Sequence, residues 1–249
     1  MAGAADLALR IGDSTLILGH RVSEWCGHAP ILEEDIALAN IALDLIGQAQ
    51  MWLAFAGEAE GRGRSADDLA FLRDAGGFRN LLICERPNGD FGQTLMRQCL
   101  FDGWHLAMLR HLIGSTEPRV AEIAAKAERE VSYHFERSSD LVIRLGDGTE
   151  ESHARMQAAL DVLWPWVGEM FAGDKTDAAL ASAGIAPAPE DLRPEWEATM
   201  GDILAESTLT RPGSDFAQLG GKQGRHTEHL GHLLAEMQFL QRAYPGATW

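Results

Sequence analysis

The sequence predicts an all-α protein built as a helical bundle. Apolar residues recur with helical spacing and do not alternate as they do in strands, and only nine of the 249 residues are proline. The stretch from Ile36 to Phe55 is apolar on nearly every side, which is typical of a helix buried inside a bundle. A chain of 249 residues can form one large domain or two modest ones, and we expect a single helical domain over residues 1–249.

Turn and capping signals divide the chain into successive helices. Asn88 to Asp90 and Pro118 suit helix starts, Pro165 is expected to kink a helix, and Gly12-Asp13-Ser14 could interrupt the first one because Asp13 and Ser14 are good N-caps. Residues 61–89 are expected to be irregular and residues 211–224 to form a flexible loop. The expected helices span residues 5–26, 33–56, 91–113, 118–145, 149–171, 190–209 and 226–244.

Charge and composition exclude several functions. The net charge of −16, from 37 acidic and 21 basic residues, disfavours nucleic acid and anionic membrane surfaces and favours a soluble protein, with a basic partner as one option. Residues 36–55 reach the length of a membrane span, but Asn40 and Asp44 near the centre predict that no span forms. The three cysteines are too few for a disulfide framework, and the N-terminal stretch does not read as a signal peptide, so we expect a cytoplasmic protein.

Polar side chains within the apolar helices suggest either a metal site or paired buried groups. A di-metal carboxylate bundle needs carboxylates from four helices and two Glu-x-x-His motifs. Asp102 and His105 match one acid-x-x-His half, but Glu130 and His134 are four residues apart, and no histidine follows Asp44 on its helix. From the residues alone we therefore favour buried polar groups that pair with one another.

Two further groups near the C-terminus could form binding sites. His229, His232 and Glu236 have a spacing that could hold an adventitious metal, although a fourth ligand is missing and a solvated helix face is the favoured interpretation. In GGKQGR, Lys222 and Arg225 could contact a partner or the phosphate of a CoA ester. The loop follows no predicted strand and lacks the Walker spacing, so a flexible loop or partner contact is favoured.

Four stretches together carry a resemblance to a known family. They are VSEWCGHAPILEEDIALANIALDLIGQA (22–49), NLLICERPNGDF (80–91), the segment 102–109, and GGKQGRHTEHLGHLLAEMQFLQR (220–242). In these stretches the chain resembles the C subunits of bacterial phenylacetyl-CoA ring-epoxidases, also called phenylacetate-CoA oxygenases. The resemblance spans nearly the whole chain.

The resemblance implies a ferritin-like bundle of the di-iron oxygenase type, with extra helices, inside a multicomponent monooxygenase of aerobic phenylacetate breakdown. The partners it implies are the catalytic A-type polypeptide, which carries the di-iron centre and binds the CoA thioester, a small bridging subunit, and an NADPH-dependent reductase. The C-type polypeptide is implied to be a relative of the A-type that has lost its metal. No cofactor is then expected on this chain, and a homo-oligomer is an option when it is alone.

The residue match is consistent with a lost metal site. Where the catalytic polypeptide is expected to read Asp-Glu-Ala-Gly-His, this chain has Asp44-Leu45-Ile46-Gly47-Gln48, and Val131 begins the acid-x-x-His slot that ends at His134. Leucine cannot bind iron, and an amide replaces imidazole poorly. The resemblance thus implies a vestigial buried polar site at Asn40, Asp44, Gln48, Asp102, His105, Glu130 and His134.

The expected function is that of a non-catalytic structural subunit that pairs with and supports the di-iron subunit. We expect Asp44, Asp102, His105, Glu130 and His134 to form a closed hydrogen-bonded set. The alternative is an independent di-metal carboxylate oxidase or oxygenase that uses these same five residues. A free-standing ferritin-like homo-oligomer is a third option. The sequence leaves open the stoichiometry and the surface that meets the catalytic partner.

Overall fold

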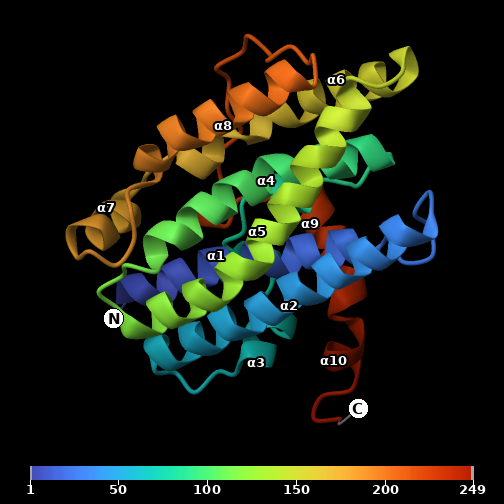
Figure 1. Ribbon diagram of the computed structural model, residues 1–249. Helices are drawn as coiled ribbons and strands as arrows, with labels where there is room; N and C mark the ends of the chain where they lie inside the picture. Colours follow the sequence, from blue (N-terminus) through green and yellow to red (C-terminus); the bar gives the residue numbers. More distant parts are fainter. Residues whose placement is uncertain (1, 248–249) are drawn as a thin grey trace. The chain divides into compact units, whose positions relative to one another are not determined.

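The computed structural model describes residues 2–247, and every regular element in that range is helical (Figure 1). The all-α prediction is therefore confirmed. Contacts within the chain define two compact units, each made of separate stretches. The first unit comprises residues 1–26, 37–87 and 220–249, and the second comprises residues 27–36 and 88–219. The expectation of a single domain stays a prediction.

The first unit is built from both ends of the chain. Its helices are α1 (Ala2–Ser23), the part of α2 (Leu32–Glu60) from residue 37 onward, α3 (Ala66–Phe71), α9 (Glu228–Met237) and α10 (Phe239–Ala243), with the short 3-10 helices η1 (Ala75–Gly77), η2 (Leu82–Glu85) and η6 (Gly221–Gln223). The core between α1 and α2 is tight, because a Cβ at Gly19 would lie 3.3 Å from the carbonyl oxygen of Ala42. Trp52 and Leu53 of α2 are fully buried.

The second unit contains the middle of the chain. Its helices are α4 (Phe91–Leu112), α5 (Pro118–Gly146), α6 (Glu150–Leu163), α7 (Lys175–Ser182) and α8 (Arg193–Glu206), with the 3-10 helices η3 (Trp164–Trp166), η4 (Gly168–Phe171) and η5 (Pro189–Leu192). The central helix α4 packs against α5, α6 and α8. At the crossing point a Cβ on Gly103 would lie 3.0 Å from the ring of Phe135 and 3.1 Å from Met200.

Capping residues and proline in the sequence predicted the starts of α4, α5 and α6 correctly. The side chain of Asp90 accepts a hydrogen bond from the backbone N–H of Gln93 and caps α4. Pro118 occupies the first turn of α5, and Thr149 caps α6 together with Ser152. Asp90 and Thr149 accept hydrogen bonds from N–H groups that have no partner within the helix. Pro118 has no backbone N–H group, so it leaves no donor unpaired in the first turn.

Four sequence predictions of local structure are wrong. The helix α1 runs unbroken through Gly12-Asp13-Ser14, because Asp13 pairs with the guanidinium of Arg73 instead of capping a helix. Residues 61–89 contain the capped helix α3 as well as η1 and η2. The helix α6 ends before Pro165 instead of kinking there. The last helix is interrupted at Gln238, whose side-chain amide donates to the carbonyl oxygens of Ala70 and Arg73, each at 2.9 Å.

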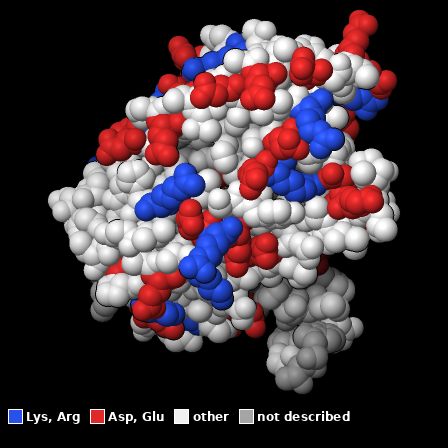
Figure 2. All heavy atoms as spheres, in the orientation of Figure 1, with Lys and Arg blue, Asp and Glu red and all other residues white. Residues whose placement is uncertain are grey.

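The helix α2 is, within the described residues, the one that could cross a membrane by length and composition. In the structure 44% of its most apolar window is buried, and buried core helices of this kind pass the same test as membrane spans. On the face drawn in Figure 2, acidic and basic side chains are interspersed among uncharged ones and do not gather into a basic patch. This face lacks the clustered cations that nucleic acid binding requires.

Candidate functional site

A buried polar cluster lies between α4 and α5 in the second unit. Asp102, His105 and His134 are fully buried, and Asp102 accepts a hydrogen bond of 3.3 Å from the hydroxyl of Ser138. Asp102 and His105 lie three residues apart on α4, so they point from the same face of that helix. These residues are three of the seven that the resemblance assigned to a vestigial site, and the structure brings them together.

The cluster is not a closed hydrogen-bonded set. The other carboxylate oxygen of Asp102 and both ring nitrogens of His105 have no hydrogen-bond partner among the described residues. His105 instead packs against aromatic rings, with its centroid 5.2 Å from that of Phe101 and 6.2 Å from that of Trp104. The expectation of a closed set is therefore wrong for His105. Glu130, on α5, is only half-buried.

Burial shifts the protonation of the cluster in two directions. Desolvation raises the pKa of Asp102 to about 7, although His134, the hydroxyl of Ser138 and the charge of Arg97 oppose the rise. Desolvation also lowers the pKa of His105 to about 3, and His134 lowers it further. The protein therefore holds Asp102 largely as a neutral acid below neutral pH and His105 as a neutral ring, which reduces the charge in its interior.

The polar residues of α2 lie in the first unit and become steadily more exposed toward the start of the helix. Gln48 is fully buried, Asp44 is half-buried, and Asn40 is exposed. The prediction that Asn40 is buried is therefore wrong. Four residues advance a helix by about 400°, so a row of residues spaced by four rotates by roughly 40° at each step. This row starts in the core at Gln48 and reaches solvent at Asn40.

The donor set does not fit a di-iron centre of the kind that the resemblance implies for the catalytic partner. Leu45 and Val131 occupy the places that the resemblance gave to lost ligand positions, and both are fully buried and apolar. Over residues 2–247 the structure contains no group of three or more His, Cys, Asp or Glu side chains arranged to hold a metal ion. The same finding covers His229, His232 and Glu236, of which His232 and Glu236 are exposed.

The glycine-rich loop at residues 220–225 is packed within the first unit, and its flexibility stays a prediction. Gln223 N and Arg225 N both donate to the carbonyl oxygen of Gly220, at 3.0 and 2.9 Å. A Cβ on Gly221 would lie 2.1 Å from the carbonyl oxygen of Asn80, so close packing alone accounts for this glycine. Lys222 is buried, whereas Arg225 and the nearby Gln223 are exposed. Of the two predicted contact residues, Arg225 is thus the more accessible.

A second buried polar cluster, missed by the sequence analysis, joins two of the stretches that carried the resemblance. The carboxylate of Glu85, fully buried, accepts hydrogen bonds from Thr227 N at 2.6 Å and from Asn80 Nδ2 at 3.2 Å, and contacts His226 Nδ1 at 3.0 Å. Arg21 donates to the backbone oxygen of Glu85 at 3.1 Å. The signal in the sequence was an acidic residue directly after the apolar run LLIC, because a carboxylate needs hydrogen-bond partners to be buried.

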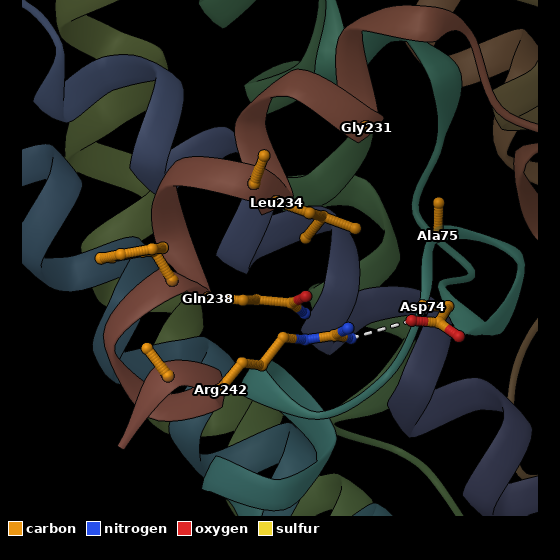
Figure 3. Close-up of a pocket in the computed structure, with 9 residues that line it drawn as sticks. Asp74, Ala75, Gly231, Leu234, Gln238 and Arg242 are labelled. Carbon is orange, nitrogen blue, oxygen red and sulfur yellow. Dashed lines mark hydrogen bonds and ion pairs between the residues drawn. The ribbon is translucent and has the colours of Figure 1, made fainter. Parts of the chain in front are cut away.

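A pocket of about 540 Å³ also lies in the first unit, between α9, α10 and η1. In Figure 3 the side chains of Arg242 and Asp74 point toward one another across it, and they form an ion pair of 3.0 Å. The amide of Gln238 is occupied by two backbone carbonyls. The pocket contains none of the predicted site residues, and its polar groups already bind one another or the backbone.

Comparison with known proteins places these features in a family. The profile of the phenylacetic acid catabolic protein family matches residues 2–249. The chain is also similar to the C subunit of the 1,2-phenylacetyl-CoA epoxidase of Escherichia coli (strain K12), with 49% identity over 241 residues. This match covers 97% of each of the two chains.

Proposed function

The chain belongs to the phenylacetic acid catabolic protein family, and from this premise we propose that it is the C subunit of a phenylacetyl-CoA epoxidase in phenylacetate catabolism. The similarity over 97% of both chains supports this assignment. In this proposal the chain works in the cytoplasm beside three partners. They are a catalytic di-iron subunit, a small bridging subunit, and an NADPH-dependent reductase.

The role we propose is structural. The observation that carries it is the burial of two apolar residues, Leu45 and Val131, which offer no donor atoms where a di-iron site would need them. The remaining polar groups Asp102, His105 and His134 are sealed in the interior, and burial keeps Asp102 and His105 largely uncharged. Such a chain supports a catalytic partner by presenting a rigid helical surface, and it binds no iron itself.

Co-purification followed by metal analysis of each chain tests the proposal. The tagged chain, co-expressed with the catalytic subunit, should retain that subunit through affinity and size-exclusion steps. After the two are separated, iron should follow the catalytic partner and remain well below one equivalent on this chain. About two irons per chain on this protein, or failure to retain the catalytic partner, contradicts the proposal.

The competing function is an independent di-metal oxidase. The acid-x-x-His pair Asp102 and His105 favours it, because two potential ligands share one face of α4. The substitution His105→Gln separates the two functions. Loss of epoxidation with an intact complex favours the oxidase, whereas full activity of the assembled complex favours the structural role. A free-standing homo-oligomer is separated from both by the same co-purification.

A further inference from the structure

A buried glutamine presents an unused amide oxygen to the pocket between α9, α10 and η1. Gln238 is only 4% exposed, and its amide nitrogen donates to the carbonyl oxygens of Ala70 and Arg73, each at 2.9 Å. Because carbonyl oxygens only accept hydrogen bonds, these two contacts fix which end of the amide is the nitrogen. The amide oxygen, Oε1, accepts no hydrogen bond from the described residues, and the side chain points into the pocket (Figure 3). The pocket therefore contains a hydrogen-bond acceptor of fixed orientation.

Arg242 places a hydrogen-bond donor beside this acceptor. Its Nε donates to Phe71 O at 3.3 Å, and its Nη2 donates to Arg73 O and to the carboxylate of Asp74, each at 3.0 Å. The remaining nitrogen, Nη1, has no acceptor among the described residues. Arg242 follows Gln238 by four residues, and its backbone N–H donates to the carbonyl oxygen of Gln238 at 3.1 Å, so the two side chains lie one helical turn apart on the same side. The pocket thus combines one fixed acceptor with one fixed donor.

The rest of the pocket is an apolar wall with an open end. Leu234 and Ala235 of α9 and Phe239 of α10 line this wall, and Phe239 is 63% exposed. At one end, a Cβ on Gly231 would meet nothing within 4 Å. The volume of about 540 Å³ and the combination of apolar surface with a few oriented polar groups are typical of binding sites. All the lining residues belong to the first unit.

The acceptor and the donor together select the chemical class of the ligand. Because they lie on the same side, the ligand has to direct one N–H and one C=O toward them together. A single trans amide does not do this, because its N–H and C=O point in opposite directions. A residue of an extended polypeptide directs its own N–H and C=O to the same edge, as residues of antiparallel strands do when they exchange two hydrogen bonds. The arrangement therefore favours a polypeptide segment, with an apolar side chain for the wall.

Charged groups fit the pocket less well than an uncharged backbone does. A carboxylate would lie near the Gln238 oxygen and near the carboxylate of Asp74, which also lines the pocket. An ammonium group would lie near the guanidinium of Arg242. Both arrangements bring like charges together, which costs free energy. We therefore expect an uncharged stretch of chain at this position.

We propose that the pocket binds an extended segment of a partner polypeptide. The inference rests on the function proposed above, because the segment is assigned to another subunit of the complex. One residue of the segment donates its N–H to Gln238 Oε1 and accepts with its C=O from Arg242 Nη1, and a neighbouring apolar side chain packs on Phe239. A helix would not use these groups, because its own N–H and C=O groups bind one another. From Gly231 to Ala243 the wall is about 18 Å long, which fits about five extended residues.

A substitution that fills the pocket tests the inference. Ala235→Trp places a large ring in the pocket. His232→Trp on the same helix is the matched control, because His232 is exposed and is not among the residues that line the pocket. Binding to each of the three purified partner subunits is measured by biolayer interferometry. We expect at least tenfold weaker binding of Ala235→Trp to one partner and less than a twofold change for the control. Both variants should keep the wild-type melting temperature, because neither residue lies in the core.

Short overlapping peptides that span this partner test the bound conformation. The peptide that binds the wild-type chain most tightly should lose at least tenfold in affinity for Ala235→Trp. N-methylation at one residue removes the N–H that Gln238 accepts, and it should weaken this peptide at least tenfold. N-methylation at the next residue should have a smaller effect, because its N–H points to the other edge of the extended segment.

The other outcomes decide against the inference in different ways. If Ala235→Trp binds every partner as well as the wild-type chain does, the inference is overturned and the proposed function stands. Peptide binding that survives N-methylation at every position in turn also overturns it. If the wild-type chain binds no partner subunit, the proposed function fails as well. A wild-type homodimer that Ala235→Trp dissociates assigns the pocket to a second copy of this chain and overturns the inference.

Discussion

The carboxylate of Glu85 and the imidazole of His226 lie 3.0 Å apart, although 141 residues separate them in the sequence. The second ring nitrogen of His226 lies 3.1 Å from the carbonyl oxygen of Phe78. Both ring nitrogens of His226 thus lie within hydrogen-bond distance of an oxygen atom. This contact ties the start of the C-terminal segment to the middle of the first unit.

Replacing His226 should destabilise the protein markedly. His226→Ala leaves the fully buried Glu85 carboxylate with one donor fewer and opens a cavity beside it. Breaking one partner of a buried pair costs on the order of 3 kcal/mol. Urea unfolding should show this loss in the free energy of unfolding. His232→Ala, an exposed position on α9, is the control and should stay within about 0.5 kcal/mol of wild type. Equal effects of the two substitutions would refute the role of the pair.

Gly221 should tolerate no side chain. A Cβ there would lie 2.1 Å from the carbonyl oxygen of Asn80, whereas a Cβ on Gly231 of α9 would meet nothing within 4 Å. Gly221→Ala must therefore displace backbone, and we expect a loss of more than about 2 kcal/mol, as for other strained substitutions. Gly231→Ala should raise stability by up to about 1 kcal/mol, since alanine is the better helix former. Thermal melts of both variants check this, and equal melting temperatures would contradict it.

The stability of the protein should depend on pH in opposite ways through Asp102 and His105. The pKa of Asp102 is about 7 in the folded state and near 3.8 when the chain is unfolded. The folded state therefore binds more protons between these values, and the Asp102 contribution to stability falls as pH rises. The pKa of His105 is about 3 when the chain is folded and about 6.5 when it is unfolded. Its contribution rises with pH over that range.

Single substitutions should reveal how each residue makes the free energy of unfolding depend on pH. The free energy of unfolding of wild type relative to Asp102→Asn should fall by about 1.4 kcal/mol per pH unit between roughly pH 4 and 7. Relative to His105→Gln it should rise by a similar amount per unit between roughly pH 3 and 6.5. Urea titrations at four pH values between about 4 and 7 measure both differences. The absence of both slopes would show that the cluster is hydrated enough to titrate normally, and two slopes of the same sign would contradict the opposite pKa shifts.

Sequence signals were sufficient where the deciding contacts are local. Asp90 and Pro118 mark helix starts through groups within one turn, and both were predicted. Asp13 was misread as a cap because its partner Arg73 is 60 residues away. The break at Gln238 depends on carbonyls near residue 70, which no helical pattern reveals.

The candidate site was predictable in its residue types but not in its burial. The acid-x-x-His spacing placed Asp102 and His105 on one face of α4, and the structure buries both. Periodicity identified the polar row on α2 but could not say which end of it faces solvent, so Asn40 was wrongly placed inside. Glu85 was overlooked because its donors come from the far end of the chain.

The three cysteines should react at very different rates. Cys26 is exposed, whereas Cys84 and Cys99 are buried. Burial and the charge of Asp102 raise the pKa of the Cys99 thiol, which suppresses the reactive thiolate. Ellman's reagent should label one thiol per chain of the native protein and all three in concentrated guanidinium chloride. Cys26→Ser should abolish the native signal, and a second rapidly labelled thiol would contradict the buried positions.

The discontinuous first unit has a consequence for synthesis on the ribosome. Residues 27–36 and 88–219 make up the whole second unit, so all of its chain has been made before residue 220 is added. The first unit contains residues 1–26 and 37–87 and is complete only once residues 220–249 have been added. Until then Glu85 lacks Thr227 and His226. A stop codon near residue 219 would therefore leave the second unit with all of its chain and the first unit without residues 220–249.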